Sequence, residues 1–128
     1  MRISDDIETS LYYALYDYGY SASAHSIPES LGDTLPHIHV TRTGGYDTDR
    51  VIEFHNVDFD VYAANATDAM EYACDLCGWV RDLEGSFCYA AEIMTLPYNN
   101  PDPRHYSLAR ATFKALITKR TKGAYYHA

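Results

Sequence analysis

The segment at residues 35–45 constrains the fold most, because polar and apolar side chains alternate along it. A proline stands near its start, and a pair of glycines closes it. A period of two places Ile38 and Val40 on one face of a strand, and His37 and His39 on the other. We therefore expect a half-buried strand in which Ile38 and Val40 pack on helices, while His37 and His39 face a neighbour, a lumen or a metal ion.

The rest of the chain predicts two helices and three more strands, in the order α-β-β-α-β-β. The first helix is expected from its cap Ser4 to Gly19, and the second from a cap at Asn65 or Thr67 to Gly85. Strands are expected at about 35–42, 51–62, 87–95 and 105–119, with loops at 20–34, 44–50 and 96–103 and a tail at 120–128. We expect one α+β domain at residues 1–128, with an N-terminal helix and loop at residues 1–34. Its sheet should have about four mostly antiparallel strands, with both helices packed on one face.

The second expected strand, at residues 51–62, changes its alternation phase partway along. The apolar side chains at 52–54 set one phase, whereas those at 57–61 set the other. A strand cannot move its apolar side chains to the other face without an irregular residue. The sequence therefore predicts a β-bulge or bend at residues 55–56.

The formal net charge is −8, and the charge is distributed unevenly along the chain. Residues 1–60 hold eleven acidic and three basic side chains, whereas residues 104–128 hold six basic and no acidic ones. The acidic excess argues against nucleic-acid binding through phosphate neutralisation. The uneven distribution instead predicts head-to-tail attraction between copies, and we expect some of the 13 tyrosines to lie in such contacts.

Cysteine content and hydropathy indicate the cellular compartment in which we expect the protein. No stretch has the apolar run of a signal peptide or a membrane span, so we expect a soluble, non-secreted protein with no membrane partner. Three cysteines are too few, and odd in number, for a disulfide framework. We therefore expect reduced thiols in a cytosol-like setting.

Two short motifs raise the alternative of a metal site. Cys74 and Cys77 form a C-x-x-C pair, and His37 and His39 form an H-x-H pair. Zinc needs four ligands, but Cys77 lies on the expected apolar stripe of the second helix, where cysteine packs as a small hydrophobe. Core packing for the cysteines and a solvated sheet face for the histidines are favoured, and a metal site at these four residues stays open.

No catalytic constellation accompanies these motifs. The chain has no G-x-S-x-G elbow and no P-loop. Asp58 and Asp60 suggest a carboxylate site, but their place on the polar side of an alternating strand favours a solvated face. We expect neither an enzyme nor a bound cofactor.

Four short segments together resemble the tail terminator proteins of long-tailed phages. Residues 35–45 resemble the LP-x-x-x-V-x-R-x-GG start of a strand in that family, and residues 57–63 resemble its next, alternating strand. Residues 64–71 are similar to the family's helix start, and residues 100–106 resemble the portion that leads into the long last strand. The match extends over about residues 31–118.

The resemblance implies an α/β subunit of a homo-hexameric ring that caps the tail tube, stops its polymerisation and forms the interface for head–tail joining. The partners would be the tail-tube protein and a head-completion or connector protein. The protein would assemble in the host cytoplasm and end in the virion, at the head-proximal end of the tail. DNA would pass through the bore without specific binding, and no catalytic residues are implied.

The expected ring contacts join acidic and basic faces. The candidate interface residues are Arg110, Lys114, Asp58, Asp60, Gly44 and Tyr46. The loop at residues 44–50 is the expected tube-facing surface, and charge reversal of Arg110 and Lys114 is expected to weaken the ring. Two other classes stay open, namely another head-closure or head–tail connector protein, and a small Cys/His metal-binding domain.

Overall fold

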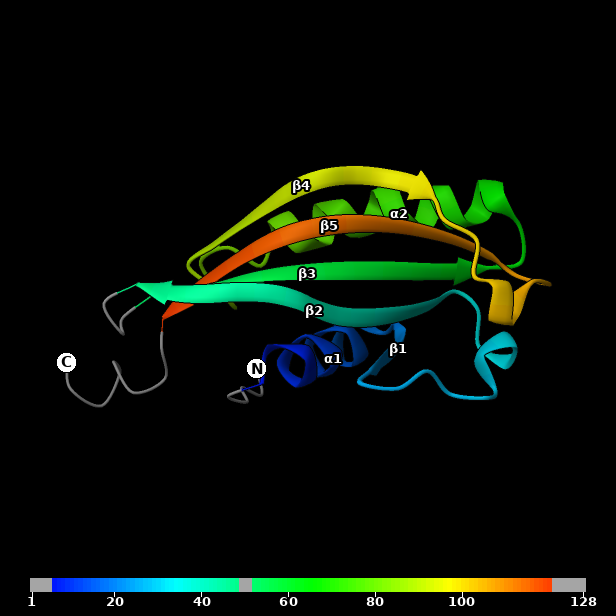
Figure 1. The fold of residues 1–128 in the computed structure, drawn as a ribbon, viewed down its shortest axis with the longest axis horizontal. Helices are drawn as coiled ribbons and strands as arrows, with labels where there is room; N and C mark the ends of the chain where they lie inside the picture. The colour runs from blue at the N-terminus through cyan, green and yellow to red at the C-terminus, as the bar shows by residue number, and fades with distance from the viewer. Residues whose placement is uncertain (1–5, 49–51, 121–128) are drawn as a thin grey trace.

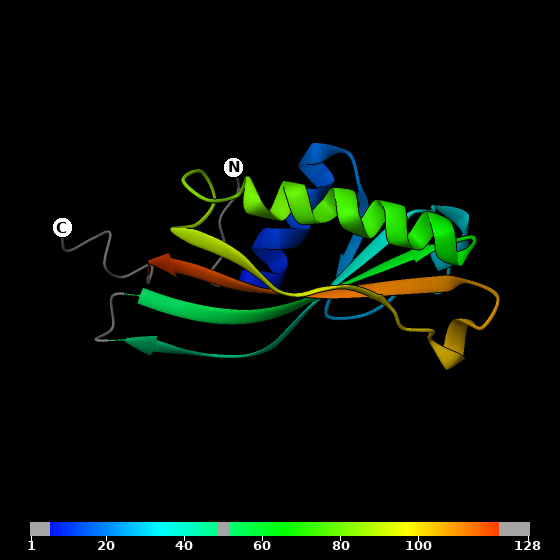
Figure 2. The same ribbon diagram turned by 90° about the horizontal axis from the view of Figure 1, so that it is seen from above.

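The sheet has five strands in the order β1-β2-β3-β5-β4, and two helices pack on one of its faces (Figures 1 and 2). This computed structural model describes residues 6–48 and 52–120. The elements are α1 (Ile7–Tyr18), β1 (Ser21–Ala24), the 3-10 helix η1 (Leu31–Asp33), β2 (His37–Thr48), β3 (Ile52–Ala63), α2 (Ala66–Arg81), β4 (Ala90–Asn99), the 3-10 helix η2 (Pro103–His105) and β5 (Ala109–Arg120). The expected α+β class is confirmed, but the sheet is mixed and has one strand more than expected.

β1 is the additional strand, in a segment where the sequence predicts a loop. It pairs with β2 in parallel, with Ser21 opposite His37 and Ser23 opposite His39. Its four residues are serine and alanine in turn, so no apolar alternation marks it as a strand. The strand exists because the neighbouring edge of β2 supplies hydrogen-bond partners, which a local pattern does not reveal.

Each helix begins at a side-chain cap. Asp6 accepts a hydrogen bond from the N–H of Glu8 at the start of α1, whereas the expected cap, Ser4, lies outside the described residues. Asn65 accepts one from the N–H of Asp68 at the start of α2, as expected. Such caps satisfy backbone donors that have no partner in the first helical turn.

Glycine ends α1 but not α2. Gly19 follows α1 with a φ of 107°, in the left-handed region that glycine adopts without strain. The expected end of α2 at Gly85 is wrong by about one turn, because the helix stops at Arg81. After Arg81 the N–H of Leu83 bonds to Val80, which tightens the chain and buries the Leu83 side chain.

One continuous apolar core lies between the helices and the sheet. The buried apolar residues of the core are Ile7, Leu11, Leu15, Ile38, Val40, Val57, Phe59, Val61, Ala63, Ala69, Ala73, Leu76, Cys77, Val80, Leu83, Cys88, Ala91, Ala111, Phe113, Ala115 and Ile117. The expected stripe of the second helix and the expected inward positions Ile38 and Val40 are confirmed. Phe59 and Phe113 stack across β3 and β5 with ring centroids 4.9 Å apart. Each such ring contributes about 2–3 kcal/mol by leaving water.

β2 and β3 form a long antiparallel hairpin that continues past the glycine pair. The expectation that the strand ends at these glycines is wrong, since β2 runs on to Thr48. Most of the expected loop at residues 44–50 is therefore strand, and its last two residues lie outside the described part of the chain. The glycines lie within the ladder, just beyond a register shift between Arg42 and Gly44.

That register shift replaces the irregularity expected in β3. β3 keeps an unbroken register with β5 from Ile52 to Ala63, so the predicted bulge at residues 55–56 is wrong. The change of apolar phase reflects two different environments. Residues 57–61 turn their apolar side chains to the core, whereas Phe54 lies on the other face and stacks on Tyr46 at 4.8 Å.

Gly45 is held where a side chain has no room. A Cβ atom there would collide with the carbonyl oxygen of Phe54 in β3, whereas at Gly44 the nearest atom would be Asn56 Nδ2 at 4.0 Å. We expect Gly45→Ala to lower the free energy of unfolding by about 1–3 kcal/mol, because the backbone must shift. Gly44→Ala is the matched control and should change it by less than about 1 kcal/mol. Equal urea-unfolding midpoints for the two variants would contradict the close approach at Gly45.

The last two strands begin later than expected. β4 starts at Ala90 and extends into the expected turn, so that Pro97 lies inside an edge strand, where a missing N–H removes no ladder bond. β5 starts at Ala109, because the segment before it forms η2. The expected tail lies outside the described residues, apart from Arg120 at the end of β5.

No helix in the described ranges has the length and apolar character needed to cross a membrane.

Candidate functional site

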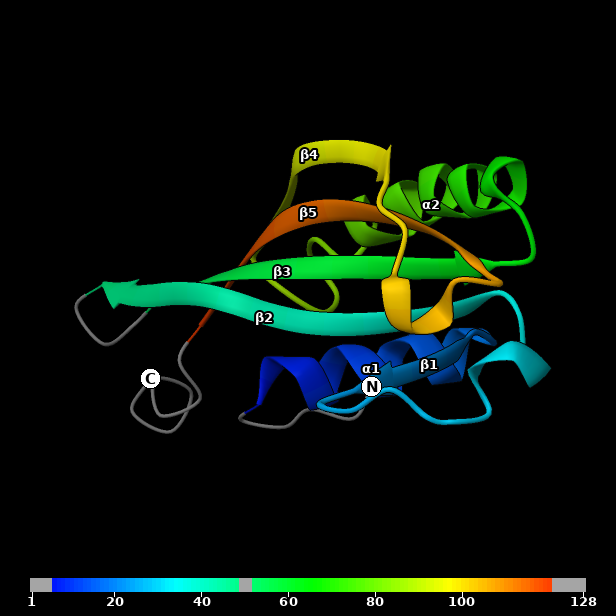
Figure 3. The same cartoon turned by 45° about the vertical axis from the view of Figure 1, so that its right-hand side comes forward.

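The sheet face opposite the helices carries most of the polar residues that the sequence singles out. The register of β2, β3 and β5 places them in three rows across the sheet. The rows are His37–Tyr62–Arg110, His39–Asp60–Thr112 and Thr41–Asp58–Lys114. We call these nine residues the polar face. η2 packs against this side of the sheet (Figures 2 and 3).

Two histidines of the polar face are buried and joined by serines of β1. The Ser23 hydroxyl lies 2.8 Å from His37 Nε2 and 2.8 Å from His39 Nδ1. His37 Nδ1 lies 2.7 Å from the Ser21 hydroxyl, which donates to Thr34 at 3.0 Å. The expectation that these histidines form a solvated face is therefore wrong, because β1 supplies hydrogen-bond partners and shields them.

The donor and the acceptor of each hydrogen bond in this chain can be assigned in turn. Ser21 already donates to Thr34, so it accepts from the Nδ1–H of His37. His37 Nε2 then accepts from the Ser23 hydroxyl, which accepts in turn from the Nδ1–H of His39. This arrangement is satisfied with both imidazoles neutral. A proton added to His37 would turn its Nε2 into a donor, so the Ser23 hydroxyl would have to turn its hydrogen away from His37.

The electrostatics of the site favour the same neutral state. Burial, together with the nearby His39, lowers the pKa of His37 to about 4. Burial also lowers the pKa of His39, against the opposing effect of Asp60 and Glu8. Both imidazoles are therefore uncharged at neutral pH. In this state their hydrogen bonds to the serines connect the edge strand β1 to β2.

A second buried cluster joins η2 to the sheet, and the sequence did not predict it. Tyr62 donates its hydroxyl hydrogen to Asp102 Oδ2 at 2.9 Å, and both side chains are buried. His105 Nδ1 lies 3.1 Å from the same oxygen, and Arg110 Nη1 lies 3.6 Å from it. Arg110 also donates to the carbonyl of Asn100 at 2.6 Å. The cluster fixes the 100–110 segment against the sheet.

The charge state of this cluster follows from its hydrogen bonds. Burial alone would raise the pKa of Asp102, but donors from His105, the backbone N–H of Arg104 and Tyr62 hold it well below its usual range. Burial raises the pKa of Tyr62 to about 12. The carboxylate of Asp102 is therefore ionised and the phenol of Tyr62 neutral. No pattern in the sequence marks this pair, because the two residues lie 40 positions apart.

Four of the expected interface residues bond within the chain. Lys114 Nζ lies 3.0 Å from Asp58 Oδ2, and this hydrogen bond raises the pKa of Lys114. Asp60 accepts from Thr112 at 2.6 Å, and Arg110 belongs to the Asp102 cluster. Charge reversal at these positions would disturb the fold as well as any contact between copies.

The four candidate metal ligands are not brought together. Cys77 is buried in the core on the helix side of the sheet, and Cys74 is exposed on the same helix. His37 and His39 lie on the other side of the sheet. In residues 6–48 and 52–120, no three His, Cys, Asp or Glu side chains form a group that could hold a metal ion. Burial also raises the pKa of Cys77 to about 11, which disfavours the thiolate that binds metal.

His55 lies on the helix side of β3, away from the face that carries His37 and His39. It accepts a hydrogen bond from Arg42 Nε at its Nδ1, at 2.8 Å, and its Nε2 lies 2.9 Å from Glu53. Burial lowers the pKa of His55, against the opposing effect of the hydrogen bond that its Nε2–H donates to Glu53. The H-x-H pair therefore gains no third imidazole.

Exposed side chains gather at the two edges of the sheet. On β4, Met94, Leu96 and Tyr98 are 59%, 68% and 38% exposed. In the part of the chain that the structure describes, no strand pairs with the outer edge of β4. At the other edge, β1 covers β2 only as far as Val40, which leaves Gly44 and Tyr46 on an uncovered strand. These edges are the surfaces at which a further copy has room to pack.

In comparisons with known proteins, no family model matches the chain, and no curated protein is similar enough to be matched.

Proposed function

We propose that this protein is a tail terminator, a structural ring subunit that caps the tail tube of a long-tailed phage. The observation that carries the proposal is the placement of the four segments that resemble that family. They occupy β2, β3, the start of α2 and the η2 segment before β5, which are successive parts of one sheet and its covering helix. A subunit of this kind acts through its surfaces and needs no catalytic group.

The two sheet edges support a head-to-tail ring. They differ in chemistry, since β4 exposes Met94, Leu96 and Tyr98 beside Glu92, whereas the β2 edge carries Tyr46 and Asp47. Unlike edges make heterologous contacts, which close into a ring when the rotation permits. Register shifts and Pro97 interrupt β4, so continuous strand pairing is excluded there. The contact would be made by the side chains of Met94, Leu96 and Tyr98.

The uneven distribution of charge supports a head-to-tail arrangement of the copies in the ring. Arg110 and Lys114 are bonded within the chain and less exposed than Arg104, whose side chain is 77% exposed although it also lies 3.6 Å from Asp102. Among residues 104–120, Arg120 is exposed as well. Acidic residues of the N-terminal part of a neighbour are the complementary surface. The acidic excess that remains would line the bore and repel phosphate, so that DNA passes without binding.

The proposal is tested by tail length. We expect the encoding phage, when it lacks this gene, to make tail tubes of uncontrolled length in negative-stain images, because nothing stops polymerisation. Tubes of normal length that fail to join heads would instead identify a head-closure or connector protein. A major tail-tube gene immediately downstream is the genetic arrangement expected for a terminator.

The ring contact is tested by a matched pair of variants. Leu96→Asp should reproduce the tail-length defect while leaving the melting temperature unchanged, because Leu96 is exposed on the β4 edge. Tyr106→Ser, at a side chain that is 91% exposed beyond η2, is the control and should leave tail length normal. Normal tails from both variants would exclude β4 as the ring contact.

A further inference from the structure

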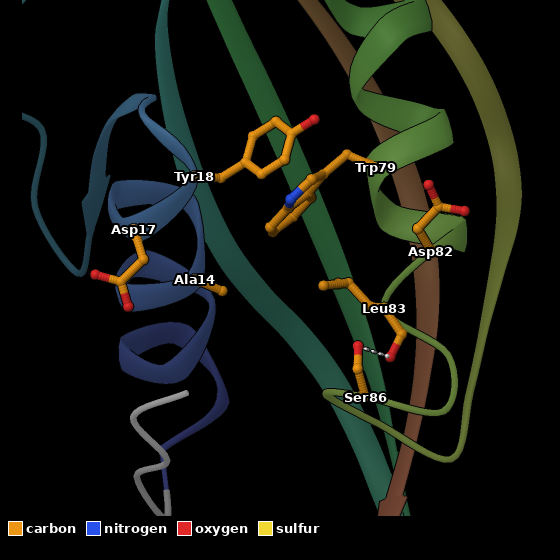
Figure 4. Close-up of a pocket in the computed structure, with 7 residues that line it drawn as sticks. All are labelled: Ala14, Asp17, Tyr18, Trp79, Asp82, Leu83 and Ser86. Carbon is orange, nitrogen blue, oxygen red and sulfur yellow. Dashed lines mark hydrogen bonds between the residues drawn. The ribbon is translucent and has the colours of Figure 1, made fainter.

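A cleft of about 460 Å³ lies between the two helices, on the side of the molecule away from the polar face (Figure 4). Its lining residues are Ala14, Asp17, Tyr18, Trp79, Asp82, Leu83 and Ser86. The rings of Tyr18 and Trp79 lie side by side above Ala14 and Leu83, with centroids 6.2 Å apart. The carboxylates of Asp17 and Asp82 stand at the outer sides of the cleft (Figure 4). The cleft thus combines an aromatic centre with acidic rims.

The backbone adds negative potential at the same place. α1 ends at Tyr18 and α2 ends at Arg81, so the C-terminal ends of both helix dipoles border the cleft. A helix C-terminus favours cations, yet α1 has no basic residue in its last turn. Asp82 caps the end of α2, and Arg81 is not among the lining residues. The carboxylates of Asp17 and Asp82 carry the same sign as these helix ends, so their combined potential at the cleft favours a cation.

The aromatic rings present surface to solvent. Tyr18 is 67% exposed and stacks on Tyr20 with centroids 5.7 Å apart. Trp79 is half-buried against the core. A guanidinium stacks on exposed rings of this kind, and its aliphatic stem covers apolar surface. The cleft has more than enough volume for such a side chain, and the carboxylates of Asp17 and Asp82 at its outer sides add negative potential (Figure 4).

We propose that the cleft between α1 and α2 binds a basic segment of a protein partner, by taking an arginine or lysine side chain over Tyr18 and Trp79. We expect arginine to bind more tightly than lysine. Its planar guanidinium can stack on the rings and pair with a carboxylate at the same time. The site lies apart from the β4 edge. It therefore does not depend on the ring proposed above.

Trp79 makes this proposal directly measurable, since it is the one tryptophan of the chain. Its fluorescence can be titrated with three synthetic peptides of equal length that alternate alanine with arginine, lysine or glutamate. We expect a saturable change with the arginine peptide, weaker binding of the lysine peptide and no response to the glutamate peptide. Added salt should weaken binding, because the charges are exposed.

Matched variants separate the cleft from the general acidity of the protein. Tyr18→Ser and Asp82→Asn should each weaken binding of the arginine peptide by about threefold or more. Tyr16→Ser replaces an equally exposed tyrosine of α1, and Glu84→Gln replaces an exposed acid beyond α2. Neither control residue lines the cleft, and both variants should keep wild-type affinity. Circular dichroism establishes that all four variants are folded.

Three results would overturn the proposal. These are a flat fluorescence titration with the arginine peptide, an equal response to the glutamate peptide, and equal weakening by the control and cleft variants. The last result would assign the binding to diffuse attraction by a chain of net charge −8. Selective weakening by Tyr18→Ser and Asp82→Asn would establish the site.

Discussion

Replacing Asp102 with alanine is expected to lower the free energy of unfolding by about 3–5 kcal/mol, which is the cost of breaking a buried charge pair from one side. The carboxylate of Asp102 accepts from Tyr62, which is fully buried, and lies 3.6 Å from Arg110. Its removal leaves the phenol hydroxyl without its acceptor and the guanidinium without its nearest carboxylate. Urea unfolding followed by circular dichroism measures the change.

The control for this prediction is a second ion pair between an aspartate and a basic side chain, one that is open to solvent. Asp58→Ala removes the partner of Lys114, whose side chain is 43% exposed, and should cost at most about 1 kcal/mol. Tyr62→Phe removes only the hydroxyl and should cost about 1–2 kcal/mol. A loss at Asp102 no larger than that at Asp58 would show that the η2 segment does not depend on the buried cluster.

Acidification is expected to destabilise the protein by at least about 2 kcal/mol between about pH 8 and pH 5. The pKa of His37 is lowered to about 4 in the folded protein, from an ordinary value of 6.5. Below about pH 6.5, His37 therefore binds a proton in the unfolded chain but not in the folded protein. The free energy of unfolding then decreases as the pH falls. The contribution of His37 levels off only below about pH 4, where the folded protein binds the proton as well. His39 and His55 act in the same direction.

Two variants assign this pH dependence to the buried chain of hydrogen bonds. His37→Gln should be less stable than the parent at pH 8 and should show a smaller decrease between pH 8 and pH 5, because one of the titrating groups is gone. Tyr16→Ser, which replaces an exposed side chain of α1 and leaves every histidine in place, is the control and should keep the full decrease. Urea midpoints that are the same at pH 8 and pH 5 would contradict the neutral, buried state of His37.

The polar face has a consequence for the proposed ring. Its histidines are shielded by β1, and its charged residues are bonded to one another. A contact between copies is therefore better sought at the β4 edge, where Met94 and Leu96 face solvent. A partner with basic side chains is better sought at the cleft between the helices.

Periodicity in the sequence determined the parts of the fold that depend on a residue and its near neighbours. Alternation placed Ile38 and Val40 in the core, and the helical stripe of α2 was correct because one face of that helix packs against the sheet. Gly19 was a correct helix stop, because its left-handed conformation is a local property. The two helices and the α+β class follow from the same patterns.

Only the tertiary structure decided the features that depend on distant residues. The strand β1 has no apolar pattern and forms because β2 offers it an edge, and its two serines convert an exposed H-x-H pair into a buried one. Asp102 meets Tyr62 only when η2 folds back on the sheet. The cleft exists because the ends of α1 and α2 come together over the core. Hydrogen bonding and packing across such separations leave no period in the sequence, so they can be located only in the folded protein.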